Sequence, residues 1–340
     1  MRRLFPIVVP ILLLLAVAAL SVPLVLGFLG SWHPALDAFS HFRLHLAATL
    51  LALAALLLFT RFRRDGAMAL ALGIAAFAVT PGTYASALLG NQAIAEPRPG
   101  DRAVYRLLQF NARYDNPAPE AFLSLVGRLK PDVITLDEVE RMWRGRLASL
   151  SAAYPHRVDC PGGEMMILSR RPFSAGTEPE CSHRNRMAIA TIDFGGQAVE
   201  IVALHLFWPW PFAQPAQVSR IAPRLAELGP AAILAGDFNA VAWSETVARV
   251  AAAARMREPG TIGPTWLPRQ APDSLRRIAG LGIDHILVGA GINVHAVATT
   301  DAAASDHLPV LLEFSLPGGA EEGSPDVHVV RGDASKADTP

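Results

Sequence analysis

The stretch Gly236-Asp-Phe-Asn239 offers a carboxylate and a carboxamide two residues apart, directly after the apolar run that begins at Ile233. A short apolar run that reaches a glycine predicts a buried strand, and side chains alternate along a strand. We therefore expect Asp237 and Asn239 on one side of the strand end, with Phe238 turned the other way. A carboxylate there can take a proton from water, and a carboxamide can hold that water or a phosphate oxygen. A strand that simply ends in an Asx turn is the structural alternative.

Further polar side chains stand at the ends of other predicted strands. They are Asn111, Glu138, His205, Asp284, Asp306 and His307. Such groups cannot be buried unpaired without a large cost, so their recurrence at strand ends predicts one shared polar pocket. Carboxylate and amide oxygens suit a hard divalent cation, with Mg²⁺ as the first choice and Mn²⁺ as the second. The histidines and cysteines lack the spacing of a zinc site.

Short strands alternate with helices after residue 103, and this order predicts an α/β fold. We expect strands at 103–110, 132–136, 156–160, 164–169, 186–194, 198–205, 233–236, 282–288, 294–299 and 308–314. Helices are expected at 118–129, 141–153, 214–228 and 244–257. Several neighbouring strands are close enough to form hairpins. The pattern predicts two sheets packed face to face, with helices outside.

Three apolar stretches before residue 92 predict a membrane anchor. They cover about residues 4–29, 44–60 and 67–89, near the length of ~20 residues that a spanning helix needs. A cleaved signal peptide is the alternative for the first stretch, but the run is too long and further spans follow. Basic residues flank the stretches at Arg2, Arg3, Arg61, Arg63 and Arg64. The positive-inside rule then places the chain after residue 92 outside the cytoplasm.

Composition divides the chain into four parts. Residues 1–92 form the predicted anchor, 93–102 a linker, 103–316 the α/β domain and 317–340 a disordered polar tail. The chain is 51% apolar and 18% charged with zero net charge, so no global basic field favours nucleic acid. Cys160 and Cys181 form either a disulfide, which an oxidising compartment permits, or two buried thiols.

Six pieces of the chain, in this order, resemble the endonuclease/exonuclease/phosphatase superfamily, which includes DNase I-like nucleases, inositol-phosphate 5-phosphatases and neutral sphingomyelinases. The matching pieces are Gln109–Asn111, Asp132–Glu138, His205, Gly236–Asn239, Ile283–Ile286 and Ser305–His307. The resemblance covers about residues 104–315. It implies metal-dependent hydrolysis of phosphate esters by a four-layer α/β sandwich, in which helices flank two packed mixed β-sheets. In this chain a bundle of three transmembrane helices would precede the sandwich.

The resemblance also implies which residues hold the metal. Glu138 resembles the principal Mg²⁺ ligand, with Asn111 beside it and Asp306 assisting. The family often has glutamine before this glutamate, whereas this chain has Asp137. Strand alternation predicts that Asp137 faces away from Glu138, or else that it serves as an extra acid behind the ligands.

The remaining matches imply catalytic roles. Asp237 resembles the residue that activates the attacking water, and Asn239 would orient that water and a phosphate oxygen. His307, paired with Asp284, would stabilise the charge that develops on phosphorus. His205 would contact another phosphate oxygen.

A hydrolase anchored outside the cytoplasm meets lipids, so a lipid-linked phosphate or phosphodiester is the leading predicted substrate. Membrane-anchored bacterial members linked to glycopeptide resistance resemble this layout, and for them the resemblance implies a polyprenyl pyrophosphate. The aromatic loop at 207–212, next to His205, either meets the bilayer interface or covers the sheet edge.

Two alternatives remain for the function: an extracytoplasmic nuclease and a catalytically silent, membrane-anchored binding module. The nuclease needs a basic groove. Candidate residues for the groove are Arg141, Arg144, Arg146, Arg170, Arg171, Arg184 and Arg186.

Overall fold

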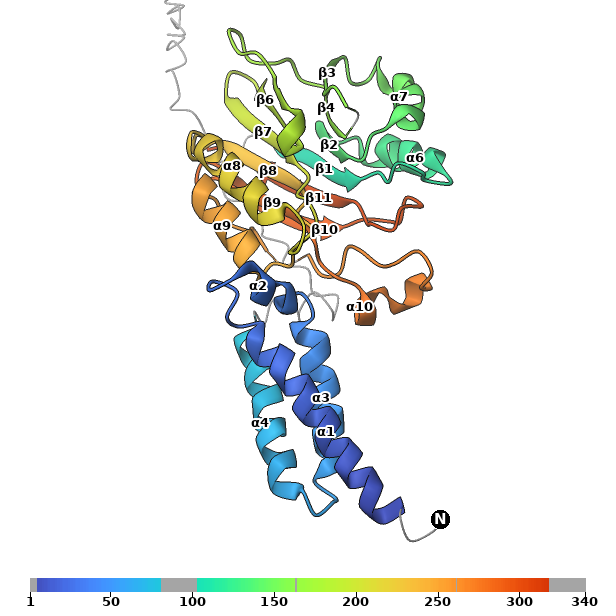
Figure 1. Cartoon of the computed structure of the whole chain (residues 1–340). Helices are drawn as coiled ribbons and strands as arrows, with labels where there is room; N and C mark the ends of the chain where they lie inside the picture. The colour runs from blue at the N-terminus through green and yellow to red at the C-terminus, as the bar shows by residue number, and fades with distance from the viewer. Residues whose placement is uncertain (1–4, 81–102, 163, 261, 318–340) are drawn as a thin grey trace, which may run out of the picture.

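The structure, a computed structural model, describes residues 5–80, 103–162, 164–260 and 262–317. Within these residues, two β-sheets pack against each other, and a separate group of helices lies at one end of them (Figure 1). The predicted linker at 93–102 and the tail from residue 318 lie outside the described residues. We call residues 5–79 the helical region and residues 103–317 the two-sheet region.

The first sheet has the strand order β10-β11-β1-β2-β4-β3. Its strands are β1 (Tyr105–Asn111), β2 (Val133–Asp137), β3 (His156–Asp159), β4 (Met165–Ser169), β10 (Asn293–Thr299) and β11 (Val310–Ser315). Strands β1 and β2 run parallel with Asn111 beside Asp137, whereas the other neighbouring pairs are antiparallel. The parallel pair therefore brings two polar strand ends to the same edge of the sheet.

The second sheet has the strand order β5-β6-β7-β8-β9. Its strands are β5 (Glu180–Ser182), β6 (Met187–Asp193), β7 (Ala198–Leu204), β8 (Ala232–Asp237) and β9 (Asp284–Val288). Strands β7 and β8 are parallel, and antiparallel pairing of β8 with β9 sets Asp237 opposite Asp284. The sequence did not predict β5, because three residues are too few to show an alternating pattern.

Helices cover the outer face of each sheet. They are α6 (Pro119–Leu129) and α7 (Arg141–Leu147) on the first sheet, and α8 (Gln214–Ala226) and α9 (Glu245–Ala254) on the second. Leu107 and Ile201 belong to the core between the sheets, whereas the next residue of β1, Leu108, packs in one cluster with Phe122 of α6. Successive strand residues thus bury both faces of each sheet. The predicted arrangement of two packed mixed sheets flanked by helices is confirmed.

Helix α7 is shorter than the predicted helix at 141–153. It ends at Leu147 and continues as a 3₁₀ turn over Ala148–Leu150. The hydroxyls of Ser149 and Ser151 each donate to a carbonyl three residues earlier. Serine side chains that bond to the local backbone compete with helix hydrogen bonds, which explains the early end.

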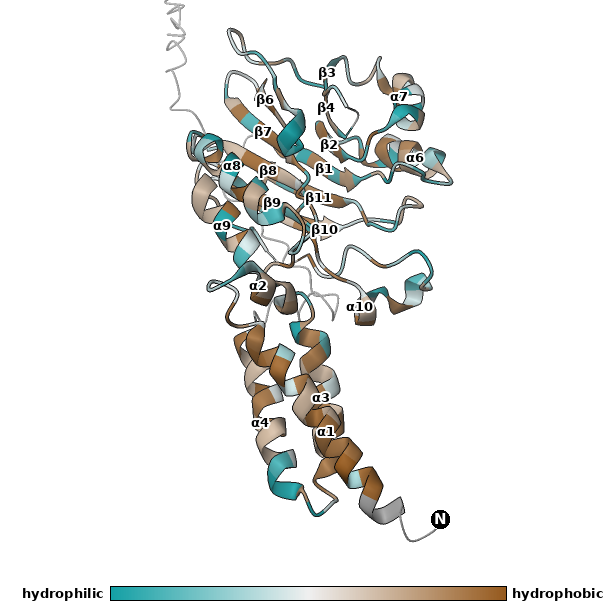
Figure 2. Cartoon of the chain, in the orientation of Figure 1, coloured by the Kyte–Doolittle hydropathy of each residue, from teal (hydrophilic) through white to brown (hydrophobic). Residues whose placement is uncertain are grey.

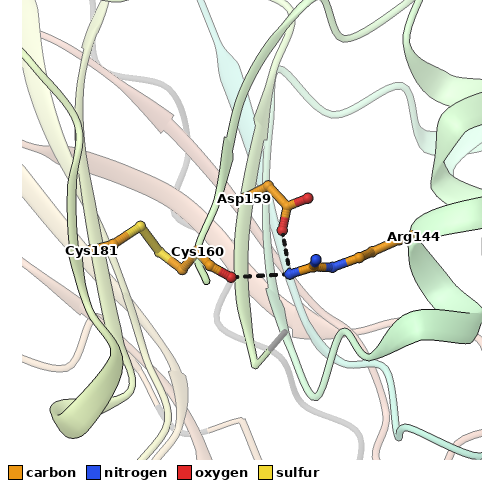
Figure 3. Close-up of a disulfide and its surroundings, with 4 residues drawn as sticks. All are labelled: Arg144, Asp159, Cys160 and Cys181. Carbon is orange, nitrogen blue, oxygen red and sulfur yellow. Dashed lines mark hydrogen bonds and ion pairs between the residues drawn. A yellow bond between two sulfur atoms is a disulfide. The ribbon is translucent and has the colours of Figure 1, made fainter. Parts of the chain in front are cut away.

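A disulfide joins Cys160, just after β3, to Cys181 in β5, with the two Cα atoms 5.5 Å apart (Figure 3). Because β3 and β5 are edge strands of different sheets, the bond ties the two sheets together. Arg144 of α7 donates to the carbonyl of Cys160 at 3.1 Å and pairs with Asp159 at 2.9 Å. Of the two alternatives for the cysteines, the structure therefore has the disulfide.

The helical region contains four helices. They are α1 (Phe5–Leu26), α2 (Pro34–Ser40), α3 (Arg43–Leu57) and α4 (Arg63–Val79). Helices α1, α3 and α4 pack around buried side chains such as Leu24 and Leu50. Their outer surfaces are also apolar (Figure 2), and Leu12 and Leu15 of α1 are both 59% exposed.

The prediction of three full membrane spans needs correction. Among the described helices taken singly, only α1 is long and apolar enough to cross a membrane, over Val8–Leu26. Helix α3 has 15 residues and α4 has 17, because residues 58–62 form turns and the third predicted stretch runs beyond residue 80. Helices α2 and α3 meet the same criteria only as a pair bent by 60°. Apolar composition alone did not reveal these breaks.

The helical region joins the two-sheet region through α2. The buried carboxylate of Asp37 accepts hydrogen bonds from the backbone N–H groups of Glu245 at 2.8 Å and Thr246 at 3.1 Å. These donors lie in the first turn of α9, which has no partner for them within the helix. Trp243 Nε1 also donates to the carbonyl of Ser40 at 2.8 Å. The contact fixes α2 against the start of α9.

Candidate active site

Asp237 is the last residue of β8, and the strand needs glycine just before it. A Cβ at Gly236 would collide with the carbonyl oxygen of Leu204 in β7. After the strand, Asn239 adopts a left-handed backbone (φ 47°), and its N–H donates to Asp237 Oδ1 at 2.8 Å. Phe238 turns into the core beneath α8 and α9. The Asx turn that was the structural alternative is therefore present, and it also fixes the carboxylate.

Asn111, at the end of β1, connects two carboxylates. Its Nδ2 donates to Asp237 Oδ2 at 3.0 Å and to Glu138 Oε1 at 3.2 Å. Its Oδ1 accepts from the backbone N–H of Arg113 at 3.0 Å. The first sheet thus contributes Asn111 and Glu138, and the second contributes Asp237.

Glu138 directly follows β2 and is half-buried, with Oε2 3.3 Å from the backbone nitrogen of Tyr114. Its backbone is left-handed (φ 57°), as are those of Arg113 after β1 and Asn239 after β8. Non-glycine residues rarely adopt this conformation, and such strain often gathers at functional sites. Three strained strand ends thus meet around the same carboxylates.

His307 and Asp284 form a buried pair. Asp284 Oδ2 lies 2.8 Å from His307 Nδ1, and Thr265 Oγ1 accepts the backbone N–H of Asp284 at 3.2 Å. The opposite ring nitrogen, Nε2, lies 3.7 Å from Asp237 Oδ2. Burial alone would lower the pKa of His307, but Asp284 and Asp237 raise it to about 10. Burial opposes the charged form of Asp284 too, yet His307 holds the pKa of that carboxyl below its usual value. His307 is therefore protonated and positively charged at neutral pH.

His205 lies near the same oxygen of Asp237 but is neutral. Its Nε2 is 3.4 Å from Asn239 Nδ2 and 3.7 Å from Asp237 Oδ2. Burial, with help from the charges of Arg186 and His307, lowers the pKa of His205 to about 3. One neutral and one charged imidazole therefore flank the same carboxylate.

The protonation of Asp237 is balanced near neutrality. Burial raises its pKa to about 7, the charge of His307 opposes the rise and Asp284 adds to it. A group with a pKa near the working pH can both accept and release a proton, as general acid–base catalysis requires.

Two further residues belong to the site, although they were not among the predicted site residues. Asp137 Oδ2 accepts from the backbone N–H of Asp237 at 2.8 Å and from Gln109 Nε2 at 3.2 Å. Gln109 Nε2 also donates to Asp284 Oδ1 at 3.2 Å. Burial, with Asp237 nearby, raises the pKa of Asp137 well above its usual range. Asp137 thus points beneath Asp237, as the alternative of an extra acid behind the ligands anticipated. The spacing of Gln109, two residues before Asn111 in β1, was the available signal for Gln109.

Seven of the eight predicted residues form one network linked by contacts of 3.7 Å or less. The eighth, Asp306, adjoins this network. Its half-buried carboxylate lies 3.4 Å from Ser305 Oγ, and the same hydroxyl donates to the carbonyl of Asn111 at 2.9 Å. Asp306 also helps to raise the pKa of His307.

The donor set fits a divalent cation. Besides the buried Asp137, three carboxyl groups lie in the network, those of Glu138, Asp237 and Asp284. Of the two histidines in the network, only His307 carries a positive charge. Asp237, Asp284 and His307 each offer a ligand atom, all within 4.8 Å of one another. His307, however, is protonated and bound to Asp284, so oxygen ligands are the better candidates. Glu138 is the most open of these carboxylates.

Comparisons with known proteins identify the family. The family model described as "Endonuclease/Exonuclease/phosphatase family" matches residues 108–307. A UPF0294 protein of Vibrio vulnificus strain YJ016 is 35% identical over 124 residues, which are 36% of this chain and 41% of that protein. The chain therefore matches less than half the length of this relative.

Two solved structures share the fold. An endonuclease/exonuclease/phosphatase family protein from Bacteroides thetaiotaomicron is 13% identical, with 63% of this chain and 98% of that chain covered and a TM-score of 0.51. D. rerio TDP2, complexed with a single-strand DNA product, is 18% identical, with 63% and 99% covered and a TM-score of 0.50. With the family model spanning the whole network around Asp237, the chain belongs to the endonuclease/exonuclease/phosphatase family of metal-dependent phosphoester hydrolases.

Proposed function

We propose that this chain is a membrane-held, Mg²⁺-dependent hydrolase that acts outside the cytoplasm on a lipid-linked phosphate or phosphodiester. The observation that carries the proposal is the position of the Asp237 network. It lies at the sheet edge next to a pocket that Asn239 shares with Ala38, His41 and Phe42 of the helical region. A phosphate bound there would be close to the part of the chain that enters the bilayer.

Asp237 would act as the general base. Its pKa of about 7 lets it take a proton from a water whose oxygen bonds to phosphorus, while the bond from phosphorus to the ester oxygen breaks and that oxygen leaves with the alcohol or phosphate group. Asn239, whose amide is held by the carbonyl of Leu206 at 2.9 Å, would orient that water. The N–H groups of Asn239 and Asn111 hold the Asp237 carboxylate in one position. Positioning of this kind is a large part of phosphoryl-transfer catalysis.

The two histidines would divide the remaining work. The charged ring of His307 would stabilise the negative charge that grows on the phosphate oxygens, and Asp284 keeps that ring charged and oriented. His205 is neutral, so it would contact a phosphate oxygen through a single N–H hydrogen bond.

Glu138 would hold the cation as an oxygen ligand, and Asp306 would assist. A bound Mg²⁺ would neutralise phosphate charge and polarise the phosphorus centre. Asn111 could join as a ligand only after its amide turns, because Nδ2 now faces both carboxylates and Oδ1 accepts from Arg113.

Membrane attachment is supported by α1 and by the apolar outer surface of the helical region. The start of α4 and the loop before it lie at the end of the helices farthest from the sheets (Figure 1). Exposed Arg61 belongs to this loop, and exposed Arg63 and Arg64 begin the helix. The positive-inside rule would keep that end in the cytoplasm and the sheets outside. The disulfide fits an oxidising compartment.

An outer-surface nuclease is the second candidate, and four of its seven groove arginines count against it. Carboxylates pair with Arg144, Arg146, Arg171 and Arg186. Arginines neutralised in this way attract the nucleic acid backbone weakly. The intact network around Asp237 likewise favours an enzyme over a silent binding module.

The test is hydrolysis by the full chain in detergent micelles with Mg²⁺. The panel contains phosphatidic acid, a prenyl pyrophosphate, phosphatidylcholine, and single- and double-stranded DNA. We expect release of phosphate or headgroup from at least one lipid, lost with a chelator and with Glu138→Gln. Rapid cleavage of DNA with no release from any lipid would contradict the proposal.

A further inference from the structure

An apolar pocket adjoins the candidate active site on the side of the helical region. Its volume is about 220 Å³. Trp208, Trp210 and Phe212 of the aromatic loop form one wall, and Ala38 and Phe42 of the helical region form another. The loop aromatics are exposed rather than packed over the sheet, with Trp208 58% and Phe212 64% exposed. The loop therefore does not serve only to cover the sheet edge.

Asn239 joins this pocket to the catalytic network. Asn239 lines the pocket, and its Nδ2 lies 3.4 Å from His205 Nε2. The rest of the lining is apolar apart from His41, and it includes Trp266, Leu281 and Ile283. A group bound in the pocket would therefore be attached within a few atoms of a phosphate bound at Asp237.

The pocket is built on fixed elements. Gln214 Nε2 donates to the carbonyls of Phe207 at 2.8 Å and Phe238 at 3.0 Å, which ties the base of the aromatic loop to the end of β8. Thr246 Oγ1 lies 3.0 Å from Gln214 Oε1, and the backbone N–H of Thr246 donates to Asp37 of α2 at 3.1 Å. The same hydrogen-bonded chain thus holds both walls. A preformed apolar pocket binds without the cost of ordering its walls.

We propose that this pocket binds the first hydrocarbon segment of an amphiphilic phosphoester, the segment next to the phosphate that the Asp237 network hydrolyses. The inference rests on the proposed function. A volume of 220 Å³ equals roughly seven water-sized groups at about 30 Å³ each, so the pocket holds a short segment and leaves the rest of the chain in the bilayer. The exposed tryptophans at its rim suit the interface between lipid and water.

The test uses the full chain with p-nitrophenyl alkyl phosphodiesters whose alkyl group is methyl, butyl, octyl or dodecyl. Burial of methylene groups should raise kcat/KM by about tenfold or more from methyl to octyl, with little further gain for dodecyl, because the pocket is then full. Ala38→Leu fills the pocket, and Trp208→Ala removes part of its wall. Each should reduce the octyl-to-methyl ratio by at least about threefold.

The matched control is Trp32→Ala, because Trp32 is an exposed tryptophan (78%) that does not line the pocket. Partition of the alkyl chains into detergent is the same for every variant. Differences between variants in the octyl-to-methyl ratio therefore reflect binding in the pocket. An octyl-to-methyl ratio that is equal in Ala38→Leu, Trp208→Ala and Trp32→Ala would overturn the pocket assignment and leave the hydrolase proposal standing.

If no diester is hydrolysed, the lipid panel above still decides the proposed function, and binding decides the pocket separately. Octylphosphonate should then bind about tenfold more tightly than methylphosphonate, and Ala38→Leu should remove the difference while Trp32→Ala keeps it. Equal dissociation constants for the two phosphonates would overturn the pocket assignment.

Discussion

The helical region and the two-sheet region differ in how far their large apolar side chains are exposed. In the two-sheet region, Phe110, Phe122 and Phe238 are fully buried. In the helical region, Leu15 of α1 is 59% exposed and Phe59, beyond α3, is 90% exposed. Water alone does not favour an outer surface like that of the helices. This difference in exposure is what the proposed membrane attachment of the helical region requires.

The exceptions in the two-sheet region sharpen this comparison. Its exposed apolar side chains include Trp208, Trp210 and Phe212 of the aromatic loop and Leu275 and Ile278 around α10 (Arg276–Ala279). Helix α10 lies at the end of the sheets nearest the helical region (Figure 1). Apolar exposure thus continues from the helices onto the adjacent end of the two-sheet region, next to the candidate active site.

The largest expected effect is a loss of catalysis without a loss of membrane attachment. Asp237→Asn removes the proposed base but keeps the shape of the side chain, so kcat should fall by about 10³-fold while the protein stays in the membrane fraction. Asp301→Asn is the matched control, because Asp301 is exposed and pairs only with Arg128 among the ion pairs described. Near-normal turnover by Asp237→Asn would show that the network does not perform the chemistry.

The second prediction tests whether the outer surface of the helical region contacts lipid. Leu15→Arg puts a charge at the middle of α1 and should cost about 3 kcal/mol if that face contacts lipid. Val104→Arg, at a 47% exposed site of the two-sheet region outside the aromatic loop and α10, should change stability by less than about 0.5 kcal/mol. Membrane flotation and thermal unfolding in nanodiscs measure both. If the two variants behave alike, the helices do not face lipid.

The disulfide concerns only the two-sheet region. Replacing Cys160 and Cys181 together with serine should lower the free energy of unfolding by about 3 kcal/mol, because the bond closes a loop with a sequence separation of 21. Reductant should lower the melting temperature of the wild type and have no effect on the double variant. If reductant does not change the melting temperature of the wild type, the disulfide is absent from the protein.

The smallest effect is a shift in pH dependence. His307 is protonated up to about pH 10, so activity that needs its charge should fall as the pH rises past that value. Because this pKa is raised above 6.5, the pair with Asp284 stabilises the fold fully below about pH 6.5 and loses this contribution as the pH rises to about 10. Asp284→Asn should move the alkaline limit of kcat down by roughly one to three pH units. If the alkaline limit of kcat does not move, Asp284 does not maintain the charge on His307.

Local sequence patterns predicted the parts of this molecule that depend on local rules. Apolar runs that end in a polar residue located β1, β2 and β8, and the order of these ends indicated that Asn111, Glu138 and Asp237 would meet. Strand alternation failed at Asp137, since β2 ends there and Glu138 turns with a positive φ. Alternation holds for residues within a regular strand. It does not apply to Glu138, which follows the last hydrogen-bonded residue of β2 in a left-handed conformation.

The contacts between the helical region and the two-sheet region were not predicted from the sequence. The bond from Thr246 to Asp37 spans 209 residues, and α2 itself is only seven residues long. Nothing in the local pattern of Asp37 distinguishes a side chain that holds two regions together from a capping acid. The pocket beside Asn239 depends on this contact, so it became visible only in the folded chain.

The most direct test of the account is whether the active site works on lipids of its own bilayer. The full chain is reconstituted in nanodiscs that contain the best lipid substrate, or in substrate-free nanodiscs that are mixed with separate nanodiscs carrying that lipid. We predict rapid Mg²⁺-dependent hydrolysis in the first case and at least about tenfold slower hydrolysis in the second, because the contact between Asp37 and α9 would hold the site beside the bilayer that the proposal assigns to the helices. Equal rates in the two arrangements would contradict a site directed at its own membrane.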